Sequence, residues 1–107
     1  DLASISPEMA ETQNFFTTTI ASELTKLEKE TNPEAKILIQ DAMLQIIRLE
    51  KQYTNLKEDL LESGDDKRVI YAIISNFQNR IDILQNTLKQ IENIKQLKNN
   101  YHANTTI

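Results

Sequence analysis

Two stretches of the chain, residues 39–60 and 70–91, carry hydrophobic residues at alternating spacings of three and four. This spacing is typical of a helix that packs one face against another helix, and each row continues for about three heptads. The first row is Ile39, Ala42, Ile46, Leu49, Tyr53, Leu56 and Leu60, and the second is Ile70, Ile74, Phe77, Ile81, Leu84, Leu88 and Ile91. The pattern predicts two long helices, each with one apolar row directed at the other and no polar residue in either row.

The chain offers few places where a helix can end. It contains one glycine and two prolines in 107 residues, whereas folds built from strands and tight turns need glycine wherever φ is positive. Gly64 suits the left-handed residue that closes a helix, and Asp65 or Asp66 suits the N-cap of the next. Ser6 and Asn32 each precede a proline, the order of an N-cap followed by the first helical residue. We therefore expect helices over about residues 7–30, 33–62 and 66–98 and a frayed polar tail over residues 99–107.

A turn at Gly64 makes the two long helices antiparallel, so Tyr53 should meet Phe77. Conformational entropy leaves such a hairpin marginal, and further burial is needed. The first predicted helix supplies it, because it carries Met9, Phe16, Ile20, Leu24 and Leu27 at helical spacing. The expected fold class is all-α, an antiparallel three-helix bundle or helical hairpin with coiled-coil-like packing, in one domain over residues 1–98.

Folding at Asn32 would place the first helix on one flank of the second, with Phe16 near Ile47 and Ile20 near Met43. This arrangement leaves an apolar strip of the third helix uncovered, because the strip lies on the opposite flank of the hairpin. Its members are Val69, Ile73, Ile83, Ile94 and Leu97. We expect a second copy of the chain, in a homodimer, or another helical protein to bind there. The alternative is that these residues belong to the core of a three-helix bundle whose helical phases are imperfect.

Composition and motifs give little support to catalysis. The chain has 12 basic and 16 acidic residues, a formal charge of −4 and no cysteine, so disulfides are excluded and unspecific phosphate or nucleic-acid binding is not expected. The one histidine, His102, lies in the predicted tail without a second ligand at helical spacing. We expect no catalytic residue, no metal and no cofactor. No apolar run approaches the length of a membrane helix.

Asparagine and glutamine are frequent, with 18 residues, more than half of them on or just after the third predicted helix. Amide side chains give a helix face that is polar but uncharged and that can hydrogen-bond a partner. Compositional bias of the source is the other explanation.

Four segments resemble a known family: residues 6–12 (SPEMAET) with 15–16 (FF), 62–72 (ESGDDKRVIYA), 76–81 (NFQNRI) and 90–95 (QIENIK). Together they are similar to the C-terminal half of small single-pass membrane proteins of Bacteroidetes bacteria that are described as anti-sigma factors. In that family a short cytoplasmic segment precedes one transmembrane helix, and a helical region like this one follows outside.

The resemblance implies a domain on the periplasmic side of the inner membrane. It would be attached through a transmembrane helix, and would reach a sigma factor through a cytoplasmic part, that these 107 residues do not include. The implied function is that of a non-enzymatic extracytoplasmic domain of a membrane-anchored regulator, acting by protein–protein interaction or self-association. Two alternatives are a structural coiled-coil spacer or scaffold and a periplasmic chaperone-like binding bundle.

Overall fold

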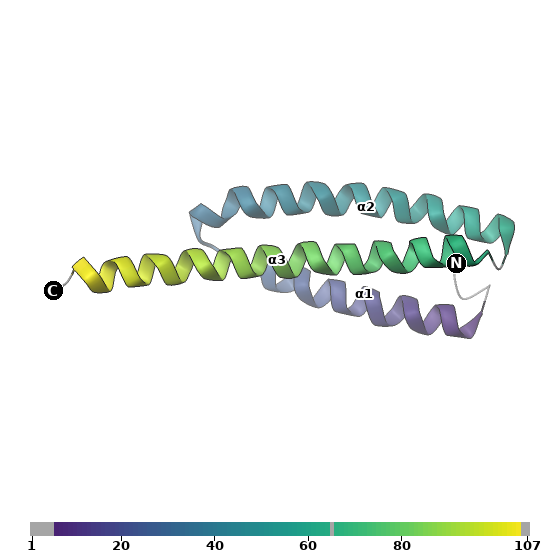
Figure 1. Ribbon diagram of the computed structural model, residues 1–107, viewed down its shortest axis with the longest axis horizontal. Coiled ribbons are helices and arrows are strands. Elements are labelled where there is room, and N and C mark those ends of the chain that lie inside the picture. The colour runs from purple at the N-terminus through teal and green to yellow at the C-terminus, as the bar shows by residue number, and fades with distance from the viewer. Residues whose placement is uncertain (1–5, 65, 106–107) are drawn as a thin grey trace.

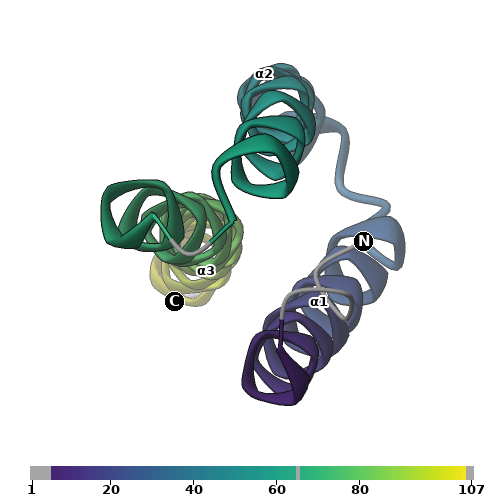
Figure 2. The same ribbon diagram turned by 90° about the vertical axis from the view of Figure 1, so that its right-hand side faces the viewer.

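Three long helices lie side by side in the computed structural model, which describes residues 6–64 and 66–105, with side chains through residue 100. The elements are α1 (Pro7–Glu28), the short 3-10 helix η2 (Pro33–Ala35), α2 (Lys36–Ser63) and α3 (Lys67–Thr105). They run up, down and up in a rod of 65 × 21 × 20 Å (Figure 1). Viewed along its length, the rod has the three helices at the corners of a triangle (Figure 2). The all-α class predicted from the sequence is confirmed.

The helix ends are fixed by the capping residues that the sequence indicates. The Ser6 hydroxyl accepts a hydrogen bond from the Met9 N–H at 3.0 Å, and the Asn32 side chain accepts one from the Glu34 N–H at 2.9 Å. Asp66 accepts one from the Arg68 N–H at 2.9 Å. Gly64 closes α2 with a φ of 77°, a value that a side chain would strain. Asp65, the alternative cap, lies outside the described residues.

The polar tail expected from Asn99 onward is helical instead, because α3 continues to Thr105. The prediction was wrong because it took the end of the apolar pattern as the end of the helix. A helix needs only its own backbone hydrogen bonds, and no glycine or proline follows Gly64 to interrupt them. Residues 106–107, and the side chains of residues 101–105, among them His102, lie outside the described part.

Tyr53 and Phe77 form the predicted contact between α2 and α3, with ring centroids 5.0 Å apart. The buried row of α3 is nevertheless rotated from the prediction and includes polar residues. Ile73, Arg80 and Thr87 are buried, whereas Ile74, Ile81 and Leu88 are only partly buried. The expectation of rows without a polar member was therefore wrong.

The rotation follows from where α1 packs. The Phe16 ring stacks on Phe77, with centroids 5.2 Å apart and planes 10° from parallel. At the other end of the contact, Lys95 pairs with Glu30 at 2.8 Å. Thus α1 covers the flank of α3 that carries Ile81 and Leu88, and the predicted place beside Ile47 was wrong: Ile47 is 49% exposed. The apolar row on this flank of α3 is longer than the one beside Ile47 on α2, so it offers α1 more apolar surface to bury.

Phe77 contacts aromatic rings on both other helices, so its truncation should be costly. We expect Phe77→Ala to lower the free energy of unfolding by about 3–5 kcal/mol, the usual range for a buried aromatic residue. Chemical denaturation followed by circular dichroism measures the change. Tyr71→Ala, at an exposed position of the same helix, should change it by less than about 0.5 kcal/mol. Equal losses in the two variants would contradict the central role of Phe77.

Candidate functional site

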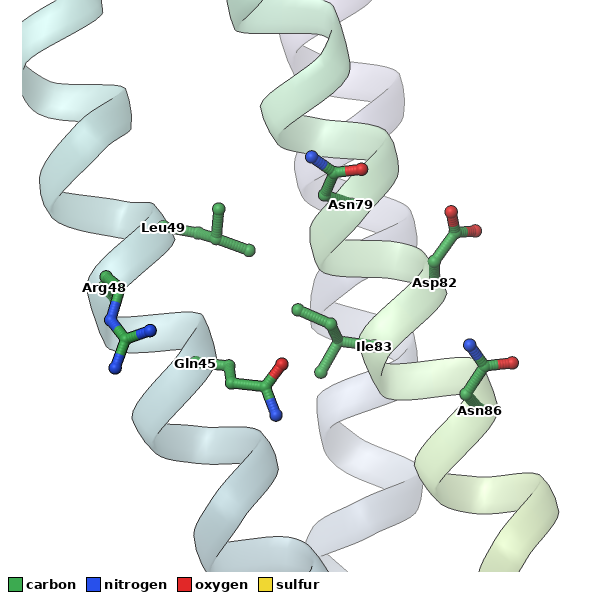
Figure 3. A pocket seen from close by; sticks show the side chains of 7 residues that line it. All are labelled: Gln45, Arg48, Leu49, Asn79, Asp82, Ile83 and Asn86. Carbon is green, nitrogen blue, oxygen red and sulfur yellow. The ribbon is translucent and has the colours of Figure 1, made fainter.

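A continuous groove runs between α2 and α3. Figure 3 shows the lining of one part of it, with α1 behind the two helices. It consists of three hollows of about 320, 430 and 260 Å³. The first shares Leu49 and Asn79 with the second, and it shares Gln45, Ile83 and Asn86 with the third. Because neighbouring hollows have residues in common, they form one elongated surface.

The groove combines an apolar floor with amide side chains along its sides. Leu49, Leu56 and Ile83 are partly buried and form the floor. The amides are Gln45, Gln52, Asn55, Asn76, Asn79, Asn86 and Gln90. We call this surface the amide groove. Some of the asparagine and glutamine side chains therefore lie on one face of the bundle, as a polar but uncharged binding face requires.

Helical periodicity places these residues together. On α3, Asn76, Asn79, Ile83, Asn86 and Gln90 follow at spacings of three and four, so they line one side of the helix. The abundance of amides is visible in the sequence, but this row was missed because the expected helix faces rested on the spacing of hydrophobic residues alone. The spacing of asparagine and glutamine at three and four residues would have predicted the row.

Asn76 joins the two walls at the base of the groove. Its side-chain amide donates a hydrogen bond to the Leu49 carbonyl oxygen at 2.8 Å. The Asn76 side-chain oxygen is buried and has no partner among the described residues. A buried amide is costly to leave unpaired, so this hydrogen bond favours the relative position of α2 and α3 at which Asn76 reaches the Leu49 carbonyl.

Arg48 and Asp82 lie on opposite edges of the amide groove, Arg48 on α2 and Asp82 on α3 (Figure 3). Both line the same hollow, and both are exposed. Neither takes part in an ion pair within the described part of the chain. The edges thus carry one uncompensated charge of each sign at the middle of the groove.

The uncovered strip predicted on the third helix is not a continuous exposed surface. Ile73 is fully buried in the core, and Val69 and Ile83 pack against the core while partly buried. Ile94 is partly buried, and Leu97 alone is largely exposed, at 69%. The premise failed because α1 occupies the other flank of α3, which turns this flank toward α2. Ile83 is the member that reaches the amide groove, and its role in binding stays a prediction.

A second polar feature lies inside the bundle, where Arg80 is 8% exposed. Its guanidinium carbon is 5.6 Å from the centre of the Tyr53 ring and 6.0 Å from that of Phe77. Its Nε and Nη1 atoms, and the Tyr53 hydroxyl, are buried without a hydrogen-bond partner among the described residues.

Burial lowers the pKa of Arg80, against the opposing influence of Glu50 and Tyr53. Burial raises the pKa of Tyr53, partly offset by the Arg80 charge and the nearby Gln13 side chain. Arg80 therefore acts as a desolvated cation held between aromatic faces. Since it lines none of the three hollows of the amide groove, we assign it to the specificity of helix packing rather than to binding.

Metal ligands and membrane-spanning segments were sought in the same part of the chain. The described residues contain no group of three or more His, Cys, Asp or Glu side chains placed to hold a metal ion. Within these residues, no helix combines the length and the apolar character needed to cross a membrane. By its extent and its concentration of amides, the amide groove is the best candidate for a functional surface in this part of the chain.

Comparison with known proteins gives no family for this chain. No model of a protein family matches it, and no match was found among curated proteins or among solved structures. The resemblance to anti-sigma factors therefore stays an expectation, and function is inferred from the amide groove.

Replacing Arg80 by an apolar residue of similar length should stabilise the bundle. We expect Arg80→Met to raise the free energy of unfolding by about 1–3 kcal/mol, because it removes buried donors that lack partners. Urea denaturation measures the difference. Lys51→Met, at an exposed position of α2, should stay within about 0.5 kcal/mol of the parent. A destabilised Arg80→Met variant would show that the guanidinium has a favourable role in the core.

Proposed function

We propose that this chain is a non-catalytic protein-interaction domain that binds its partner through the amide groove. The observation that carries the proposal is the continuous open surface between α2 and α3, with an apolar floor and amide sides. Burial of the floor supplies affinity. The amides supply direction, because each one both donates and accepts hydrogen bonds.

The shape and charge of the amide groove favour a protein partner over other ligands. Small-molecule sites enclose most of their ligand, whereas this groove is open along its length. Nucleic acids are bound mainly through clustered lysine and arginine side chains, whereas amides dominate here and Arg48 is offset by Asp82. A groove between two helices is the surface into which another helix packs. The expected partner is therefore a helical protein.

In its wider setting, we assign the domain to the periplasmic side of the inner membrane, as the outer part of a membrane-anchored regulator of the anti-sigma type. The similarity of residues 6–12, 15–16, 62–72, 76–81 and 90–95 to that family supports this assignment. Binding in the outer domain would then change the association of the inner segments. An open groove also favours binding over a passive spacer, which needs no recessed face.

Photo-crosslinking in the living cell tests the binding surface. With a benzophenone amino acid in place of Asn86 in the full-length protein, we expect a covalent adduct with one defined protein, resolved by electrophoresis and identified by mass spectrometry. The matched control places the same amino acid at Thr18, an exposed position of α1, where no such adduct should form. Equal yields at both positions, or none at position 86, would refute the proposed binding face.

The regulatory assignment has a separate test. Replacing Asn79 and Asn86 together by lysine in the full-length gene should alter transcription of genes controlled by a sigma factor encoded beside it, measured by RNA sequencing. Thr18→Lys serves as the control. If the double variant loses the adduct at an unaltered groove position, such as 45, while transcription is unchanged, binding stands and the regulatory role fails.

A further inference from the structure

Building on the proposed function, we infer that the helical partner in the amide groove is a second copy of this chain. The two copies are related by a two-fold axis that runs parallel to the groove. In this arrangement α2 of each copy lies over α3 of the other, and both copies point in the same direction. The result is a central bundle of four helices, α2 and α3 of each copy, with the two α1 helices on its outside.

The lining of the groove is complementary to itself. At one level Gln45 of α2 lies opposite Asn86 of α3, and at the next Gln52 lies opposite Asn79. The two-fold axis places Gln45 of one copy over Asn86 of the other, and Gln52 over Asn79. Because an amide is both donor and acceptor, each pair can form hydrogen bonds without introducing a charge. A symmetric interface requires a surface that recognises itself in this way.

The charges at the edges match under the same operation. Arg48 and Asp82 line one hollow from opposite sides and have no ion-pair partner among the described residues. The two-fold axis places Arg48 of each copy over Asp82 of the other, which gives two opposite-charge contacts. Charge complementarity of this kind fixes orientation more than affinity.

The exposed apolar side chains select the parallel orientation. Ile37 and Leu97 are 70% and 69% exposed, and they lie at the same end of the bundle, where Lys98 pairs with Glu34 at 3.6 Å. An axis parallel to the groove brings Ile37 of one copy to Leu97 of the other and removes both from water. An axis across the groove would instead place α2 over α2 and leave these two side chains at opposite ends.

The size of the groove predicts a weak, reversible dimer. Its α2 wall extends over residues 38–56, or about 27 Å at 1.5 Å per residue. With a width of two helices, about 20 Å, each copy covers on the order of 500 Å², below the roughly 800 Å² per partner of a standard interface. Association should therefore be seen at high micromolar concentration.

Complementation between two charge-reversed variants tests the inference. Arg48→Asp alone and Asp82→Arg alone should each weaken the dimer by at least about tenfold in Kd, because like charges then face each other twice. An equimolar mixture should restore association to near the parent level. In the mixed dimer every contact between positions 48 and 82 again joins a carboxylate to a guanidinium. Sedimentation equilibrium of the parent, the two variants and their mixture measures this.

Two matched charge reversals at exposed positions outside the groove lining, Glu11→Arg on α1 and Lys29→Asp at its C-cap, should leave association unchanged. Circular dichroism melting confirms that every variant is folded. A parent chain that stays monomeric overturns the inference, as does a dimer whose variants are not rescued by mixing. A dimer that neither single variant weakens also overturns it, because an axis across the groove would already place like charges against each other in the parent. A monomeric chain that still forms the adduct at position 86 with another protein would leave the proposed function intact.

Discussion

The structure depends on one aromatic contact that joins all three helices. Phe77 on α3 is fully buried, and its ring lies against Phe16 of α1 and Tyr53 of α2. Only residues 29–32 separate α1 from η2, and the backbones of α1 and α2 approach each other less closely than either approaches α3. The contacts of Phe77 therefore fix the axial position of both α1 and α2 along α3. A rod with so narrow a cross-section has few such residues, so each one matters more than in a globular core.

The amide groove is a consequence of where α1 packs. Both flanks of α3 carry apolar residues, and α1 covers the flank with Ile81 and Leu88. The other flank then meets α2, which buries Ile73 and leaves Ile83 at the floor of the groove. Had α1 packed beside Ile47 instead, Ile73 would face solvent and the binding surface would be apolar rather than amide-rich. The position of α1 on α3 thus determines which side chains line the groove between α2 and α3, although α1 does not line that groove itself.

Much of the fold follows from the sequence, and the exceptions have physical causes. The apolar rows predicted two long helices, and Gly64, Asn32 and Ser6 predicted their limits, because these signals are local. The rotation of α3 does not follow from local signals. It depends on which flank α1 covers, and predicting that requires comparing two similar burial energies, one for each position of α1. The burial of Arg80 could not be predicted from the spacing of apolar residues either, because it also depends on which flank of α3 is covered by α1. The amide groove was accessible in principle, since its residues repeat at helical spacing.

The parallel course of α1 and α3 has a mechanical consequence. The helix α1 begins at the end of the rod where α2 is followed by α3, and α3 ends at the opposite end of the rod, beyond the Lys98–Glu34 ion pair (Figure 1). Force applied between these two positions would load the interface of α1 and α3 in shear along its whole length. Contacts such as those of Phe16 and Lys95 would then have to yield together rather than one after another. Tension along the axis would thus be resisted by the whole interface of α1 and α3 at once.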